Sequence, residues 1–303
     1  MMVATLADLQ NAMNPQLDLF ADSCAVMLRN DLIDALQCHD TSAARAVLAA
    51  LAVEADNDAA LADGWVVIAG LLADEAPFDG LEAALQARAQ MAESTLPAAV
   101  RVMGSARAAA WSALPWARLA RRAAALPFRP EAADGHASPL WLLAHKWQAA
   151  AQAVQTIASW RRIPAPLAWM AEAHWHLHGL DGTWPLLTEL AWLAPARWQA
   201  VAQALPDRAL NRLAQRFEES FDDAAATEAW AWLPAWALCD QPLLAAPMAT
   251  AEPLRQTEPE QGWQLVQALL RLERHGRHAE AMENRRKLKV LHGGLFAAYM
   301  RGR

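Results

Sequence analysis

Residues 28–51 read LRNDLIDALQCHDTSAARAVLAAL, a stretch whose apolar residues recur every three or four positions. Its first half carries one apolar stripe, made of Leu28, Leu32, Ala35 and Leu36. After a polar break at residues 39–41 comes a second stripe, made of Ala44, Val47, Leu48 and Leu51. This spacing puts each stripe on one face of an α-helix, and the short break lets the two helices fold back on each other. The stretch therefore predicts an antiparallel helical hairpin.

The composition of the whole chain favours helices over strands. Of the 303 residues, 55% are hydrophobic and 19% are charged, so the chain can bury a large core. Alanine supplies about a quarter of the residues, whereas Val, Ile, Thr and Tyr are scarce beside Leu and Ala. Because these last four favour strands and alanine favours helices, we predict an all-α protein.

A second helical hairpin is predicted near the end of the chain. Its first stripe consists of Trp263, Val266, Leu269, Leu270 and Leu272, and its second of Ala281, Leu288 and Leu291. The break between them contains Gly276, five residues before Ala281. This pair resembles a tetratricopeptide repeat, a family in which a turn glycine precedes a small residue that lets two helices approach closely.

The resemblance is limited to paired helices. Nothing recurs at the 34-residue period of the tetratricopeptide family, and its tryptophan, tyrosine and proline landmarks are not jointly present in any one unit. Prolines that mark helix starts are unevenly spaced, at Pro139, Pro166, Pro185 and Pro195. We therefore predict irregular antiparallel helical hairpins in a tetratricopeptide-like α-solenoid.

Two proline-containing stretches divide the chain. Residues 128–139 hold two prolines, residues 245–262 hold three, and both stretches are predicted to be linkers. The predicted organisation is an N-terminal tail at 1–22, an N-terminal helical block at 23–127, a linker at 128–139, a Trp-rich central helical block at 140–244, a linker at 245–262 and a basic C-terminal helical hairpin at 263–303. Most Trp residues of the central block are expected in the core, with a few left on a groove that could grip a partner.

The three cysteines, Cys24, Cys38 and Cys239, are odd in number and far apart. They encode neither a disulfide framework nor a thiolate zinc site. The N-terminus does not read as a secretory signal, and no apolar stretch is long enough for a membrane span. We therefore expect a cytoplasmic protein with no membrane association.

A pentapeptide near the start departs from the helical pattern. It follows Asn14-Pro15, where proline disfavours a continuous helix, and precedes Asp22-Ser23, which reads as a helix N-cap. The pentapeptide consists of Gln16, Leu17, Asp18, Leu19 and Phe20. Two interpretations are open: a docking peptide, or a hydrophobic staple that packs on the first helices.

All five positions of the pentapeptide resemble the glutamine-leucine-serine/aspartate-leucine-phenylalanine motif with which bacterial polymerases and repair factors bind the sliding clamp. The resemblance implies that Gln16 is hydrogen-bonded in a small subsite, while Leu19 and Phe20 fill an apolar pocket. Two apolar anchors with one polar group that fixes the register are a sound basis for peptide docking.

Positive charge gathers at the C-terminal end. Between residues 271 and 303, nine Arg or Lys residues accompany three glutamates, a local charge of +6 that leaves −13 for the rest of the chain. The candidate nucleic-acid residues are Arg285, Arg286, Lys287 and Lys289. The alternative is a solvated terminal helix, and we favour it because the remaining −13 would repel a duplex.

The densest group of possible metal ligands is Glu172-Ala-His174-Trp-His176-Leu-His178. On a helix, His174 and His178 share a face, while His176 points elsewhere. A zinc site needs a third ligand that the sequence does not supply, so we expect no metal and no cofactor. The sequence also lacks a nucleophile elbow, a phosphate-binding loop and a dinucleotide fingerprint.

These patterns predict a non-enzymatic adaptor of bacterial type that binds other macromolecules and docks on the sliding clamp through its pentapeptide. One alternative is a protein-binding scaffold with a Trp-lined groove and no link to DNA. Another is a metal-dependent enzyme centred on His174 and His178. The sequence identifies neither the partner nor the oligomeric state.

Overall fold

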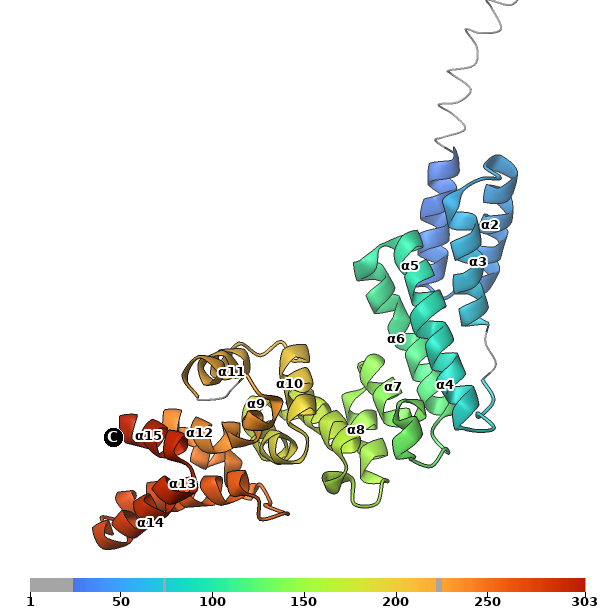
Figure 1. Cartoon of the computed structure of the whole chain (residues 1–303). Coiled ribbons are helices and arrows are strands. Elements are labelled where there is room, and N and C mark those ends of the chain that lie inside the picture. The colour runs from blue at the N-terminus through green and yellow to red at the C-terminus, as the bar shows by residue number, and fades with distance from the viewer. Residues whose placement is uncertain (1–23, 73–74, 222–224, 303) are drawn as a thin grey trace, which may run out of the picture. The chain divides into compact units, whose positions relative to one another are not determined.

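The computed structural model describes residues 24–72, 75–221 and 225–302. Within these ranges the chain forms helices and turns and no strand (Figure 1). Successive helices pack against their neighbours, which confirms the predicted all-α helical-repeat class. No described helix combines the length and the apolar character needed to cross a bilayer.

The chain divides into two compact units, residues 1–145 and 146–303. In the first unit, helical residues 24–37 precede the remaining elements, which are α2 (Thr41–Glu54), α3 (Ala59–Leu71), α4 (Leu81–Gln90), the π-helical turn η1 (Met91–Thr95), α5 (Leu96–Met103), α6 (Ser105–Arg122), the 3₁₀ segment η2 (Pro130–Gly135) and α7 (Ala137–Leu143). Along the chain, α2 packs on α3, α3 on α5, α5 on α6 and α6 on α7.

The first predicted hairpin is confirmed. Asp40 caps α2 because its Oδ1 accepts hydrogen bonds from the amides of Ser42 at 3.0 Å and Ala43 at 2.9 Å. The fully buried residues of the two stripes are Leu32, Leu36, Ala44, Leu48 and Leu51. Burial of these side chains, each leucine contributing about 1.5–3 kcal/mol relative to exposure, holds the pair together.

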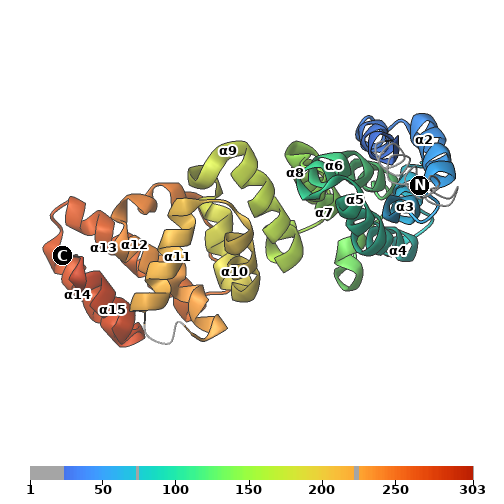
Figure 2. The same ribbon diagram turned by 90° about the horizontal axis from the view of Figure 1, so that it is seen from above.

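The second unit contains more elements of irregular length. They are α8 (Trp147–Gln155), η3 (Trp160–Arg162), α9 (Pro164–Leu193), α10 (Pro195–Ala204), α11 (Arg208–Ser220), η4 (Thr227–Trp232), α12 (Leu233–Asp240), η5 (Pro242–Ala245), η6 (Pro247–Thr250), α13 (Glu258–Arg274), α14 (His278–Leu291) and α15 (Gly293–Arg301). In this unit α13 packs on α12 and α14, and α15 packs on α12 and α14 (Figure 2).

Tryptophan contributes many of the large buried side chains of the second unit, as expected for the central block. The buried indoles of that block are Trp169, Trp184, Trp192, Trp198, Trp230, Trp232 and Trp236. Some meet directly: the ring centroids of Trp198 and Trp230 are 5.3 Å apart. Such contacts add to the large apolar area that each indole removes from water.

Two buried carboxylates order the chain between η6 and α13. The carboxylate of Glu189 on α9 accepts hydrogen bonds from Nε and Nη2 of Arg161 at 2.8 and 2.6 Å. It also accepts one from the backbone amide of Glu252 at 3.0 Å. Glu260 in the first turn of α13 accepts the amides of Leu254 and Thr257 at 3.0 and 2.8 Å. The second set includes a capping box, since the Thr257 side chain also caps the helix.

The predicted linkers contain ordered structure. Residues 128–139 hold η2 and the start of α7, and the division between the two units falls after His145. Residues 245–262 hold η6 and the start of α13 and lie inside the second unit. Prolines begin the short helices here, because proline is well suited to the first helical turn.

The predicted C-terminal hairpin contains a third helix. Two helices were expected over residues 263–303, but α14 ends at Leu291 and α15 begins at Gly293. His292 is extended, with φ −156°, and its Nδ1 accepts the Leu295 amide at 2.9 Å. A histidine N-cap followed by two glycines therefore ends one helix and starts another.

His136 makes the stability of the first unit dependent on pH. It is buried, and its Nδ1 accepts the Ser138 amide at the start of α7. Burial lowers the pKa of His136 from 6.5 to about 4. Below pH 6.5, His136 therefore becomes protonated in the unfolded chain while it stays neutral in the folded chain. The stability that this histidine contributes is fully present above pH 6.5 and is lost as the pH falls toward 4.

We predict that this proton uptake lowers the free energy of unfolding by about 2 kcal/mol between pH 7.5 and 5.0. His136→Asn should remove that part of the pH dependence, since asparagine also caps a helix but does not titrate. Urea unfolding of the full chain at both pH values measures it. An unchanged pH dependence in the variant would contradict the assignment.

Candidate functional site

The pentapeptide lies outside the residues that the structure describes. Whether Gln16, Leu17, Asp18, Leu19 and Phe20 are accessible or packed stays a prediction from sequence. The candidate site is therefore built from the terminal hairpin, α13 and α14, where the positive charge of the chain gathers.

Arg285 does not belong to a solvated basic strip, which corrects the sequence-based expectation. Its Nη2 donates to Glu273 Oε1 at 2.8 Å, and its Nε donates to the Tyr299 hydroxyl at 3.2 Å. The Tyr299 hydroxyl also donates to Glu273. Arg285 thus joins α13, α14 and α15, and these contacts raise its pKa, which keeps the guanidinium charged.

The other three basic candidates lie at the surface of α14. Lys287 Nζ is 4.0 Å from Glu283 Oε1, an exposed pair one helical turn apart. Lys289 Nζ lies 5.9 Å from the ring centroid of Phe296. Among the described residues, Arg286 has no carboxylate within ion-pair distance. Exposed charges of this kind contribute little to folding stability and remain available for a ligand.

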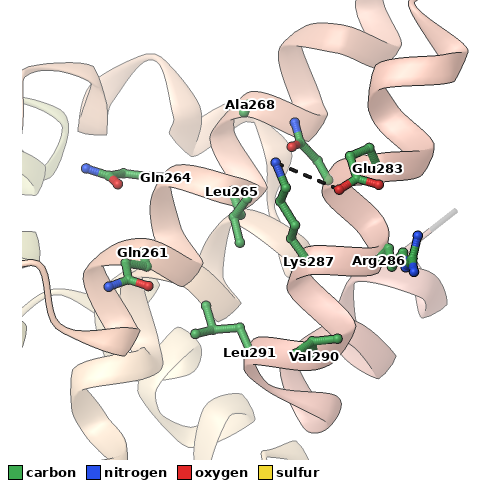
Figure 3. A pocket seen from close by; sticks show the side chains of 10 residues that line it. Gln261, Gln264, Leu265, Ala268, Glu283, Arg286, Lys287, Val290 and Leu291 are labelled. Atoms are coloured by element: carbon green, nitrogen blue, oxygen red, sulfur yellow. Dashed lines mark ion pairs between the residues drawn. The ribbon is translucent and has the colours of Figure 1, made fainter.

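A groove of about 670 Å³ lies between α13 and α14 (Figure 3). The residues from α13 are Gln261, Gln264, Leu265 and Ala268, and those from α14 are Glu283, Asn284, Arg286, Lys287, Val290 and Leu291. The α13 members are spaced three, four and seven residues from the first, so they share one helix face. Val290 is 84% exposed, so apolar surface is uncovered at this groove.

Two further grooves continue along α13. One, of about 350 Å³, shares Gln264 and Ala268 with the first and adds Ala245, Gln267, Arg271 and Arg274. The next, of about 610 Å³, shares Ala245 and Arg274 and includes Leu243, which is 90% exposed. We call the three adjoining grooves together the α13 surface.

The α13 surface is lined by amide, charged and aliphatic groups. The first groove presents amide side chains, guanidinium and ammonium groups and aliphatic carbons, with Glu283 as its one lining carboxylate. No histidine, cysteine or serine lines any of the three grooves. The Ser–His and Cys–His pairs that many acyl-transfer enzymes use are therefore missing from these linings.

His174 and His178 share a helix face, as their spacing predicted. Their ring centroids are 4.8 Å apart on α9, and burial is the main cause that lowers the pKa of His174. His176 points elsewhere and stacks on Trp147 with a centroid distance of 3.6 Å. The described part of the chain contains no cluster of three or more His, Cys, Asp or Glu side chains that could hold a metal.

No tryptophan lines the three grooves of the α13 surface. Trp198 and Trp230 border a hollow of about 170 Å³, but both are buried. Sequence reasoning instead missed the polar residues of α13, which are Gln261, Gln264, Gln267, Arg271 and Arg274. Their signal was present, because they recur every three or four positions opposite the apolar stripe.

The comparisons with known proteins add no family. A scan against protein-family models found no match, and neither curated proteins nor solved structures gave a similar protein. The fold and surface thus define the chain as an all-α helical-repeat protein with an open, amide-rich and basic helix face.

We predict that the full chain purifies without stoichiometric zinc, because two histidines on one helix leave at least one protein ligand of a zinc site unsupplied. Elemental analysis of protein prepared without chelator measures the metal content, with His174→Ala as the comparison. One zinc per chain that is lost in His174→Ala would contradict this prediction and revive the metalloenzyme alternative.

Proposed function

We propose that this chain is a non-enzymatic adaptor that binds other proteins, with its α13 surface as one binding site and its pentapeptide as a second. In the specific form of the proposal, the pentapeptide docks on the bacterial sliding clamp and the helical body holds another replication or repair factor. The protein works in the cytoplasm and requires no cofactor.

The observation that carries the protein-binding role is the α13 surface. It runs along α13, combines uncovered aliphatic carbons with amides and charges, and has no histidine, cysteine or serine in its linings. Apolar contact area with a few oriented polar groups is what peptide-binding sites use for affinity and specificity. Helical-repeat proteins commonly bind partners along such open faces.

The clamp-docking role rests on the sequence. All five residues from Gln16 to Phe20 match the clamp motif, and Asn14-Pro15 disfavours a helix running into them. A scaffold with no link to DNA uses the same α13 surface and remains the alternative. Direct nucleic-acid binding has less support, because Arg285 is engaged by Glu273 and Tyr299.

We predict that Leu19→Ala/Phe20→Ala abolishes binding to a purified bacterial sliding clamp, because each side chain is an apolar anchor worth roughly 2 kcal/mol or more. Gln16→Ala should weaken binding less, since it removes only the group that fixes the register. Isothermal titration calorimetry with the full chain measures the affinities, and circular dichroism checks that helicity is unchanged.

The matched control is Leu6→Ala/Leu9→Ala, which removes two leucines from the same N-terminal stretch but outside the motif. It should bind the clamp as the wild type does. Equal affinity of Leu19→Ala/Phe20→Ala and wild type, or no binding by the wild type, would exclude the clamp-docking role and leave the scaffold interpretation.

A further inference from the structure

We propose that the α13 surface recognises an acidic peptide segment of the partner protein, whose carboxylates meet arginines and whose aliphatic side chains rest on Leu265, Val290 and Leu291. This inference deepens the protein-binding part of the proposed function and rests on it. It does not depend on the clamp.

The positive charge of the α13 surface favours a negatively charged ligand. Arg286 and Lys287 line the first groove, and Arg271 and Arg274 line the second. Within the described chain, no ion pair engages Arg271, Arg274 or Arg286, and the Lys287–Glu283 pair is long and exposed. The nearby carboxylate of Glu273 is taken by Arg285. A ligand that supplies carboxylates therefore meets open guanidinium groups, which bind them through two hydrogen bonds each.

The amide side chains specify a peptide rather than a small anion. Gln261, Gln264 and Gln267 follow one another along α13, and Asn284 faces them from α14. Each amide group both donates and accepts hydrogen bonds, as a peptide backbone does. The glutamines occupy α13 from residue 261 to 267, and Arg271 and Arg274 follow on the same helix, so one extended segment can contact both groups.

The apolar part of the groove provides the anchor. Leu265 and Leu291 are half-buried at the groove, and the exposed Val290 stands beside them (Figure 3). Covering such carbons contributes about 25 cal/mol for each Å² removed from water. Charges alone would give a weak, unspecific attraction, whereas the aliphatic floor fixes where a leucine-like side chain sits.

Nucleic acid fits this surface less well. No aromatic side chain lines the three grooves, so bases would find nothing on which to stack. The aliphatic floor of Leu265, Val290 and Leu291 would lie against a phosphate backbone, which has no apolar side chains to cover it. Peptide is therefore the occupant that the surface chemistry favours.

The test is a selection of peptides on the intact chain. A random library of 12-residue peptides displayed on phage is panned against the protein, and enriched sequences are synthesised and measured by fluorescence polarisation. We expect enriched peptides to carry net negative charge and at least one Leu, Ile or Phe. Their affinity should fall with rising salt, because exposed charges are screened.

Two variants locate the binding. Arg271→Gln/Arg286→Gln should weaken binding of the selected peptides about tenfold or more, because the variant removes two guanidinium groups that would bind carboxylates. Arg208→Gln/Arg212→Gln on α11 removes the same charge from two exposed arginines away from the α13 surface and should leave affinity unchanged. Val290→Asp should also weaken binding, by placing a like charge at the groove.

The outcomes separate this inference from the function on which it rests. Neutral or basic peptides that bind and are lost in Val290→Asp would overturn the acidic specificity but keep the protein-binding function. If no peptide is enriched, or if the peptides bind every α13 variant as tightly as the wild type, both the acidic specificity and the protein-binding function of this surface are overturned. A 12-nucleotide single strand that displaces the peptides and binds more tightly would assign the surface to nucleic acid instead.

Discussion

The carboxylate of Glu189 is the buried charge on which the second unit depends. Its environment is dry, and burial raises the pKa of Glu189, while the Arg161 guanidinium and the Glu252 amide oppose that rise. Three hydrogen bonds at 2.6 to 3.0 Å offset the desolvation penalty. Because the partners come from η3, α9 and the chain after η6, this one group holds together segments that are distant in sequence.

Glu260 continues the same arrangement toward the α13 surface. Its carboxylate accepts hydrogen bonds from the backbone amides of Leu254, Arg255 and Thr257. The chain between residues 252 and 260 is therefore held by Glu189 at its beginning and by Glu260 at its end. The segment leads directly into α13, whose far end is closed by Gly276 with φ 66° and by the Arg277 amide donating to the Leu272 carbonyl. The α13 surface is thus presented by a helix fixed at its beginning and its end.

The spacing of apolar residues along the sequence was enough to predict the helices. Stripes such as Leu32 and Leu36 with Leu48 and Leu51 predicted a hairpin because helix periodicity is a property of neighbouring residues. The Glu189–Arg161 pair joins residues 28 positions apart, and the pairing of Arg285 with Glu273 and Tyr299 needs three helices in place. No periodicity marks such contacts. The same limit explains why Arg285 was expected in a solvated strip. The polar face of α13, in contrast, does follow helix periodicity, and only its grooves with neighbouring segments needed the folded structure.

Amide hydrogen exchange in the intact chain tests most directly whether buried carboxylates fix α13 and its surface. In the wild type, the amides of Glu252, Leu254, Arg255 and Thr257 should be protected, since each donates to Glu189 or Glu260. Glu260→Ala should expose the last three and speed exchange in the first turns of α13, whereas Glu258→Ala, at an exposed position of the same turn, should not. Unchanged exchange in Glu260→Ala would contradict the account.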